Sequence, residues 1–350
     1  MIKPVIQTWS SILSNLRSAA ALWAVLFLFV GCINEDLSDC GVDYQVKYHL
    51  KLVTNLQSEI EQEMTSPEEI ALGQAMNQTF ERVFQEYAQD IDLSFYKEGM
   101  SLEHHESTLM DGATATYSVY LPQHNYMHLA IANQQVEKEV TRDHLYEIAN
   151  HGLHVDANDT VQSQQIGLFT GRLPMRVEDR DQIFNVSLYP VNAAEALVLN
   201  LNNQPVQAVK VYVKDLATSY YVRDSLYTFD RAIVMTQQKL EAEVGQLRCY
   251  YGVGFPSRQA PAEKPAASLK AEDQDVAQGA LWEMHVYVTM SNGKTTQNRL
   301  YVKTPLRPGQ LKIIKAKIDE EGKLTPADNE VGVGVTLDWK PGGEFEQDLD

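Results

Sequence analysis

The sequence predicts an all-β protein with one helix in the N-terminal domain and two antiparallel β-sandwich domains. Apolar and polar residues alternate with a period of two in many short segments, and turn residues separate these segments. This pattern is typical of half-buried strands in a sandwich. The length of 350 residues favours two domains over one. Hydrophobic residues are 44% of the chain and charged residues 22%, so each domain can form a core.

Residues 1–31 have the pattern of a signal peptide. Lys3 and Arg17 are the only charged residues before Glu35, and residues 19–30 form an uninterrupted apolar run. As a helix, that run would rise about 18 Å. The hydrocarbon core of a bilayer is roughly 30 Å thick, so cleavage fits this segment better than a permanent membrane span.

The apolar run ends in Phe29-Val30-Gly31-Cys32, which resembles the lipobox of bacterial lipoproteins. In that motif, small residues precede a cysteine that is acylated and becomes the new N-terminus. Cys32 is therefore the predicted lipidation site, residues 32–43 are the predicted lipidated tether, and membrane lipid is a predicted partner. The alternative is an ordinary signal peptide that is cut elsewhere.

The charge balance excludes one class of partner. The chain has 29 basic and 47 acidic residues, a net charge of −18. Because such a chain repels polyphosphate, we predict no nucleic-acid partner. Glu35 and Asp36, soon after Cys32, resemble a surface-export signal of some Gram-negative lipoproteins, and a solvated acidic tether is the alternative.

Two further cysteines, Cys40 and Cys249, remain after the predicted cleavage. An exported protein is in an oxidising compartment, where such a pair can form a disulfide. Their positions in the sequence do not show how far apart they lie, so the bond and two free thiols both stay open.

The first domain is predicted at residues 44–178, and its first strand at residues 44–52. The apolar face of that strand carries Tyr44, Val46, Tyr48, Leu50 and Leu52. Ser66 as N-cap, Pro67 at the first helical position and Glu69 in a capping box then predict a helix of about 20 residues. Further strands are predicted at residues 92–96, 116–121, 126–132 and 165–170.

A polar stretch, residues 171–181, interrupts the alternation and places the predicted domain boundary near residue 178. The second domain is predicted at residues 179–340, followed by a tail, residues 341–350. Its candidate strands are residues 183–191, 196–201, 206–214, 225–229, 246–255, 281–290, 299–304, 311–318 and 331–339.

The sequence contains no recognisable catalytic or cofactor motif. Seven of the nine histidines lie between residues 104 and 154, but they lack the compact spacing of a metal site. Gly332 and Gly334 lack the third glycine and the helix of a dinucleotide loop, and strand glycines are the better interpretation. We therefore predict no metal, no cofactor and no enzymatic activity.

Three segments together resemble the fimbrium-anchoring subunits of type V pili. They are Cys32-Ile-Asn-Glu-Asp-Leu-Ser-Asp-Cys40, Leu129-Ala-Ile-Ala-Asn133 and Val335-Thr-Leu-Asp-Trp-Lys-Pro-Gly-Gly-Glu-Phe345. The resemblance extends over nearly the whole mature chain. It implies two transthyretin-like sandwich domains and a surface-exposed lipoprotein of the outer membrane. It also implies a role at the base of a fimbrium, with the fimbrial shaft (fimbrillin) subunit as partner and without catalysis.

The resemblance also implies a role for the first strand. In these fimbriae, shaft subunits lose their first strand to an arginine-specific protease, and a neighbouring subunit fills the groove by strand addition. This chain has no arginine between Cys32 and Glu81. We therefore expect residues 44–52 to stay in place, which would stop further addition. The alternative is that arginine is absent there by chance.

Two rival classes remain open, a surface glycan- or nutrient-binding lipoprotein and a secreted enzyme. A glycan binder is expected to carry aromatic side chains on exposed loops. Trp282 and Trp339 lie instead in predicted strands, which favours the anchoring interpretation.

Overall fold

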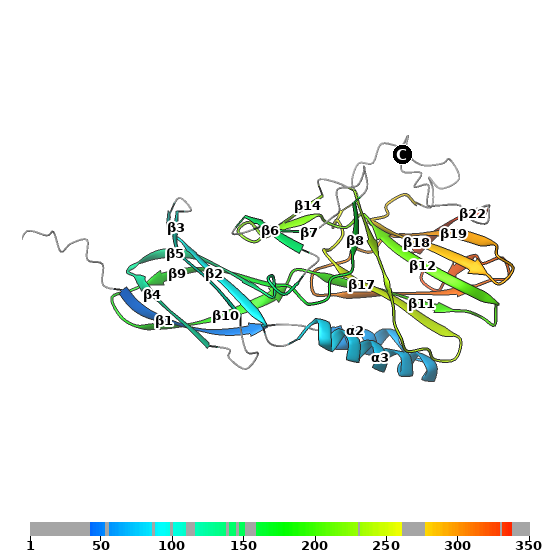
Figure 1. Cartoon of the computed structure of the whole chain (residues 1–350), viewed down its shortest axis with the longest axis horizontal. Helices are drawn as coiled ribbons and strands as arrows, with labels where there is room; N and C mark the ends of the chain where they lie inside the picture. Colours follow the sequence, from blue (N-terminus) through cyan, green and yellow to red (C-terminus); the bar gives the residue numbers. More distant parts are fainter. Residues whose placement is uncertain are drawn as a thin grey trace, which may run out of the picture.

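The computed structural model describes residues 43–52, 56–85, 88–98, 101–109, 116–137, 140–144, 147–150, 159–229, 232–260, 277–329 and 331–337. Strands dominate this part of the chain and form two sandwiches, which confirms the predicted all-β class (Figure 1). The predicted signal peptide, the tether up to residue 42 and the tail, residues 341–350, lie outside the described residues.

The first sandwich, at the left of Figure 1, contains seven strands in the order β3-β2-β5-β9-β10-β1-β4. Strands β9 and β10 pair only at two positions near one end, so β3-β2-β5-β9 and β10-β1-β4 form two layers. Buried side chains of both layers belong to one core. The strands are β1 (Asp43–Leu52), β2 (Asp90–Tyr96), β3 (Leu102–Leu109), β4 (Thr116–Pro122), β5 (His124–Ala132), β9 (Phe169–Val177) and β10 (Gln182–Pro190).

The second sandwich packs a five-stranded sheet, β16-β17-β11-β20-β21, against a six-stranded sheet, β22-β19-β18-β12-β15-β8. Trp282 is fully buried in the core between them, and its indole Nε1 donates to the Thr304 carbonyl at 2.9 Å. The strands are β8 (Asp159–Gln162), β11 (Ala193–Asn200), β12 (Val206–Lys214), β15 (Ile233–Thr236), β16 (Gln238–Lys239), β17 (Leu247–Gly254), β18 (Trp282–Met290), β19 (Thr295–Val302), β20 (Leu311–Ile318), β21 (Leu324–Pro326) and β22 (Val331–Leu337).

A small third sheet lies beside the junction of the sandwiches, in the order β14-β13-β7-β6 (Figure 1). Its strands are β6 (Val140–His144), β7 (Glu147–Asn150), β13 (Ser219–Tyr221) and β14 (Leu226–Thr228). Tyr220 of β13 shares a buried cluster with Leu129 and Ile131 of β5 in the first sandwich. This sheet therefore adds apolar contact between the two halves of the chain.

The start of the predicted helix is correct. The number of helices and the domain against which they pack differ from the prediction. Helix α3 (Pro67–Val83) has Ser66 as its N-cap and the predicted capping box with Glu69. A second helix, α2 (Leu56–Glu63), precedes it. Both lie against the five-stranded sheet of the second sandwich rather than on the first domain (Figure 1). An amphipathic pattern shows which face of a helix is buried, but not which sheet covers that face.

Contacts from both helices explain this position. The Glu59 carboxylate accepts the Leu311 backbone N–H at 2.9 Å, and Lys315 Nζ lies 3.1 Å from Glu69 Oε1. Burial alone would raise the pKa of Glu69, but backbone hydrogen bonds from Ser66 and Thr65 and the Lys315 ammonium lower it to about 2. The cap of α3 and its docking on the sheet therefore depend on one carboxylate.

The predicted domain boundary near residue 178 is wrong. Strand β10 lies beyond it, yet pairs in parallel with β1, so the first sandwich extends to Pro190. The stretch that was predicted to interrupt the strands contains most of β9. Conversely, β8 lies before the predicted boundary but pairs in parallel with β15 of the second sandwich. Within the described residues the strand pairs are antiparallel, as predicted, except for the three parallel pairs β1–β10, β8–β15 and β11–β20.

A fully buried carboxyl lies between the sheets of the second sandwich. Burial raises the pKa of Glu195 to about 8, and a 3.3 Å hydrogen bond from Gln237 Nε2 opposes the shift only in part. The other carboxyl oxygen, Oε2, has no partner within the described residues. Between pH 4.5 and 8 the folded protein therefore binds a proton at Glu195 that the unfolded chain has released.

We predict that Glu195→Gln stabilises the protein increasingly as the pH rises. Because the folded pKa is raised, the wild-type stability contributed by this group is complete below pH 4.5 and is lost as the pH rises towards 8. The loss is at most about 1.4 kcal/mol per pH unit. Urea unfolding at pH 5, 6.5 and 8 measures it, with the exposed Glu320→Gln as control. A stability difference between Glu195→Gln and wild type that stays constant over this range would contradict the assignment.

Candidate functional site

The first strand, β1, is the candidate functional site, because the sequence analysis predicts that it stays in place and so prevents the addition of a strand from another molecule. It lies between two neighbours, antiparallel to β4 and parallel to β10. Cα partners run from Asp43↔Pro122 to His49↔Thr116 on one side and from Val46↔Gln182 to Leu52↔Leu188 on the other. Strand β1 therefore occupies the middle of its layer and not an edge.

The side chains of β1 place the predicted apolar face towards the core. Val46 is 0% exposed and Tyr44 packs against the same cluster, whereas Lys47, one position on, is exposed. The cluster around Val46 includes Val119 and Leu121 of β4 and Leu188 of β10. The backbone of Tyr48, Leu50 and Leu52 lies in β1, but their side chains are outside the described part. The predicted orientation towards the core is therefore correct for Val46 and Tyr44.

The positions of arginine determine where an arginine-specific protease could cut near β1. Arg82 is the first arginine after Cys32, and it lies in the last turn of α3, after β1 and both helices. Proteases bind their substrates in extended form, which a helical turn does not offer without local unfolding. An arginine-specific cut between Cys32 and α3 therefore has no target in the sequence.

The structure tests neither the lipidation nor the disulfide prediction. Cys32 and Cys40 lie outside the described residues, so lipidation stays a prediction. Cys249 is a free, fully buried thiol in β17, and burial raises its pKa to about 12. Because thiol–disulfide exchange needs the thiolate, this position does not favour a bond with Cys40. The disulfide also stays a prediction.

Two of the described histidines, His105 and His128, have structural contacts. His105 Nε2 lies 2.8 Å from Asp92 Oδ2, and buried His128 stacks on Phe95 with ring centroids 4.4 Å apart. Burial lowers the pKa of His128 to about 4, so the ring is neutral. Within the described residues, no three potential ligands come together in a metal-binding group.

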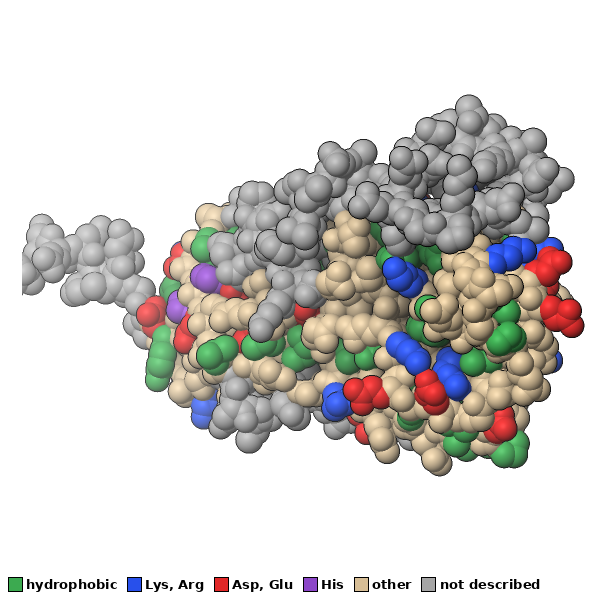
Figure 2. Space-filling model, turned by 45° about the vertical axis from the view of Figure 1, so that its right-hand side comes forward, with side chains coloured by type: hydrophobic (Ala, Val, Ile, Leu, Met, Phe, Trp, Pro, Cys, Tyr) green, Lys and Arg blue, Asp and Glu red, His purple; other side chains and the backbone are tan. Residues whose placement is uncertain are grey.

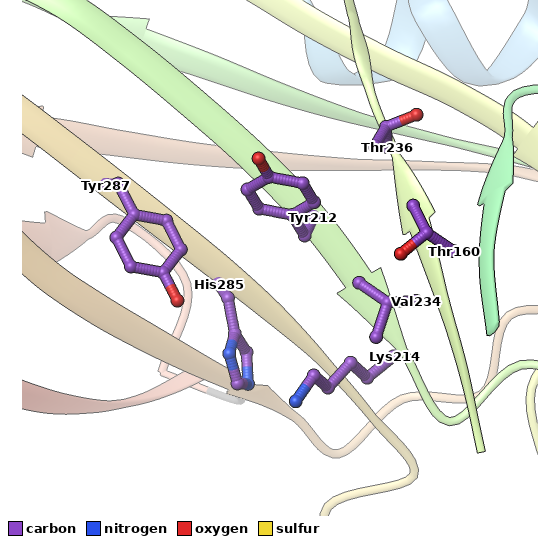
Figure 3. Close-up of a pocket in the computed structure, with 7 residues that line it drawn as sticks. All are labelled: Thr160, Tyr212, Lys214, Val234, Thr236, His285 and Tyr287. Carbon is purple, nitrogen blue, oxygen red and sulfur yellow. The ribbon is translucent and has the colours of Figure 1, made fainter. Parts of the chain in front are cut away.

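A shallow cavity on the outer side of the six-stranded sheet escaped the sequence analysis. Its volume is about 340 Å³, and four strands contribute to it. Figure 3 shows the lining residues, which are Thr160, Tyr212, Lys214, Val234, Thr236, His285 and Tyr287. The rings of Tyr212 and Tyr287 meet edge to face, with centroids 5.9 Å apart. The signal in the sequence was the set of polar and aromatic residues at alternate positions of β12 and β18.

The electrostatics of this cavity are set by burial and by two cations. Burial lowers the pKa of His285, and nearby Lys214 and Arg299 lower it further, against the effect of a 3.1 Å hydrogen bond with Glu283. Burial also raises the pKa values of Tyr212 and Tyr287. At neutral pH the cavity therefore presents neutral phenols and a neutral imidazole beside an ammonium group.

The remaining surface shows no single charged region on the face in Figure 2, where lysines and arginines lie beside acidic side chains. Lys239 and Arg248, for example, both pair with Glu243. No helix in the described part of the chain is long and apolar enough to cross a membrane.

Comparison with known proteins shows a shared fold. No family model matches the chain, and no curated protein matches its sequence. A structure described as a proposed polysaccharide-binding protein of Bacteroides thetaiotaomicron aligns with a TM-score of 0.50 and 8% identity, over 85% of this chain and 99% of that chain. At this identity the match shows the fold alone.

Two fimbrial proteins of Porphyromonas gingivalis are also similar. The fimbrial anchor protein Mfa2 has a TM-score of 0.43 and 8% identity, over 84% of this chain and 98% of its own. The tip fimbrial protein Mfa3 has a TM-score of 0.41 and 12% identity, over 85% of this chain and 100% of its own. Scores this low do not distinguish an anchor from a tip.

We predict that Val46→Asp releases β1 from its layer. A carboxylate at this fully buried position costs several kcal/mol unless the strand leaves the core. The exposed strand should then be cut by a lysine-specific protease at Lys47 and Lys51 at least about ten-fold faster, since cleavage follows the open population. Gln45→Asp, on the opposite face of β1, is the control. Equal cleavage rates for both variants would show that β1 is not held by its apolar face.

Proposed function

We propose that this chain is a fimbrium-anchoring subunit, a surface lipoprotein that attaches a fimbrium to the outer membrane and limits its length. The observation that carries the proposal is the position of β1, which is paired on both sides and buries Val46 in the core. A groove that already holds its own strand has no free backbone edge to offer to another subunit.

Whether the fimbrium stops growing would then depend on whether a subunit loses its first strand. A shaft subunit that loses its first strand exposes a groove, and the next subunit fills it. The chain has no arginine between Cys32 and Arg82, so β1 would stay and the series would end here. The chain can still join the last shaft subunit through another surface, which makes the fimbrillin subunit its expected partner.

The lipid would hold this end of the assembly at the membrane. Strand β1 begins at the end of the first sandwich that is farthest from the second (Figure 1). Asp43 follows Cys32 by eleven residues, so the tether between them spans at most about 40 Å. The first sandwich would therefore lie close to the outer membrane, and the second would point away from it. Supporting adhesion at the cell surface is then the biological role.

A surface glycan-binding lipoprotein is the second candidate. The observation that favours it is the tyrosine-lined cavity in Figure 3, because aromatic and hydroxyl groups are suited to sugars. The aligned Bacteroides thetaiotaomicron protein is itself described as a proposed polysaccharide binder. The gene neighbourhood separates the two candidates, since a fimbrillin gene would favour anchoring and a TonB-type transporter gene would favour nutrient capture.

We predict that Cys32→Ala releases the protein, together with its fimbriae, from the membrane fraction. The two or three acyl chains of a bacterial lipoprotein are the expected anchor, at about 0.8 kcal/mol for each buried methylene. Metabolic labelling with a fatty acid measures the modification, and Cys40→Ala is the matched control. Equal label and equal membrane retention in Cys32→Ala would remove the lipid anchor from this proposal.

We predict that Asn55→Arg, between β1 and α2, abolishes termination in the presence of the arginine-specific protease. A cut there leaves β1 held only by its pairing with β4 and β10, so the strand can dissociate and open the groove. Longer and shed fimbriae are expected in electron micrographs. Asn55→Lys carries the same charge without the cleavage site and should behave as wild type.

Sequencing the N-terminus of the wild-type protein isolated with its fimbriae can contradict this prediction. A mature chain that begins beyond Leu52 would show that β1 is removed in the native assembly. Termination would then need another cause, even if Cys32 carries lipid.

A further inference from the structure

Strand β4 forms one edge of the first sandwich and carries little protection against pairing with another strand. It is the last strand in the order of its sheet, and among the described strands only β1 pairs with it (Figure 1). Its residues, Thr-Tyr-Ser-Val-Tyr-Leu-Pro, include no charged side chain. Natural edge strands usually carry charges or a bulge that prevent the addition of a further strand. In β4 only the final residue, Pro122, is of a protective kind.

The other long edge strands within the described residues differ from β4. Strand β3 contains Glu103 and Glu106, and β6 contains Arg142 and Asp143. Strand β22 also lacks charge, but its sequence, Val-Gly-Val-Gly-Val-Thr-Leu, has glycines at alternate positions, which weaken a strand. The β-branched and aromatic residues of β4 are those that favour strand pairing. Strand β4 is therefore the described edge that is best suited to receive another strand.

The contacts of β1 show which backbone groups of β4 take part in the existing sheet. The Gln45 N–H donates to Asp181 Oδ1 at 3.0 Å, on the side of β10. Because backbone groups alternate between the two sides of a strand, the groups of Val46 point to the other side, towards β4. The partner of Val46 in β4 is Val119. Val119 therefore exchanges its hydrogen bonds with β1.

The backbone groups of Ser118 and Tyr120, on either side of Val119, then point to the free edge. The same alternation places Pro122 on this edge, where a proline is tolerated because its missing N–H breaks no bond of the sheet. The side chains of Ser118 and Tyr120 lie on the outer face, and Tyr120 is 62% exposed although it is aromatic. Backbone donors, backbone acceptors and an exposed ring thus lie together at one edge.

A second copy of β4 that runs antiparallel complements this edge. In a two-fold pairing centred on Val119, Ser118 of each copy lies opposite Tyr120 of the other and exchanges hydrogen bonds with it. The two Tyr120 side chains are then diagonal neighbours on the outer face, about 7–8 Å apart, which is within reach of aromatic contact. One symmetric arrangement therefore satisfies the free backbone groups and covers the exposed ring.

The charges near this edge also permit the approach of a second copy, although the chain has a net charge of −18. No carboxylate lies in β4, and the nearest cation is Lys47, opposite Ser118 in β1. In the two-fold pairing at least three strand spacings, about 14 Å, separate the two Lys47 side chains. This separation exceeds the Debye length of about 8 Å at physiological salt, so their repulsion is screened.

We propose that the free edge of β4 joins two copies of this chain, so that their β10-β1-β4 layers form one continuous sheet. The edge lies on the side of β4 away from β1, so this pairing does not use the position of β1 and does not depend on the anchoring function. A single strand pair buries less surface than a stable dimer needs, so the dissociation constant should be about 1–100 μM.

Analytical ultracentrifugation of the purified chain over a range of concentrations tests the dimer. The weight-average mass should rise from that of one chain towards that of two. Tyr120→Lys, which places a charge at the edge and removes the ring, should raise the dissociation constant at least about ten-fold. Val335→Lys places the same charge on the uncharged edge strand β22 and should change it less than about two-fold.

A proline at residue 118 tests the backbone contact separately. Ser118→Pro removes an N–H that points to the free edge and none of the hydrogen bonds with β1, so the fold should be kept and the dimer weakened at least about ten-fold. Ser118→Ala keeps that N–H and should dimerise as wild type does. Near-ultraviolet circular dichroism checks that each variant is folded.

A cysteine at residue 119 tests the register. In the two-fold pairing the two Val119 form a non-hydrogen-bonded pair with Cα atoms about 4.5 Å apart, a distance that a disulfide can span. Val119→Cys should therefore give a cross-linked dimer on a non-reducing gel under mild oxidation. Ser118→Cys is the control, because the two residues 118 are diagonal neighbours about 7–8 Å apart and should cross-link poorly.

Three outcomes would overturn the proposal. The first is a chain that stays monomeric at concentrations up to about 1 mM. The second is a dimer that persists in Tyr120→Lys and Ser118→Pro, or that Val335→Lys abolishes, since another edge would then make the contact. The third is equal cross-linking of Val119→Cys and Ser118→Cys, which would exclude the pairing centred on Val119.

Discussion

The buried hydrogen-bond network between the two sandwiches is the constraint on which the rest of the structure depends. Asn192 Oδ1 accepts the Leu168 N–H at 3.3 Å, and its Nδ2 donates to Gln164 Oε1 at 3.0 Å and to the Ile166 carbonyl at 3.3 Å. Glu137 Oε2 accepts the N–H groups of Gln165 and Ile166 at 2.6 and 2.8 Å. These backbone groups lie outside any strand, and without the two side chains they would be buried without partners, at about 1–3 kcal/mol each. The network fixes the short connection from β10 to β11, and so holds the sandwiches together.

This connection gives β1 its importance under the proposed function. Strand β1 is paired in parallel with β10, and β10 leads within two residues into β11, a central strand of the second sandwich. A pull on the N-terminus would load the β1–β10 ladder and, along the chain, the helices α2 and α3 that lie against the second sandwich. The ladder would then both close the groove and carry part of the load of an anchored fimbrium. Because its inward positions include fully buried Val46, opening the groove also costs core packing.

The protein uses charge in two different ways. Individual carboxylates are buried where they satisfy backbone groups, as Glu137 does at the junction and Asp90 does for the N–H groups of Gln135 and Val136. Cations gather instead on one outer sheet face, around Arg299.

Local patterns in the sequence determined the class of the fold, the strand at residues 206–214, the strand at residues 311–318 and the start of α3 at Ser66. Period-two alternation and capping are contacts between near neighbours, so they can be read along the chain. Only the tertiary structure decided that the helices cover the second sandwich, that β10 belongs to the first, and that Tyr212, His285 and Arg299 form one row. Each of these depends on pairing between distant segments, and alternation fixes which side a residue faces but not which strand or helix lies beside it.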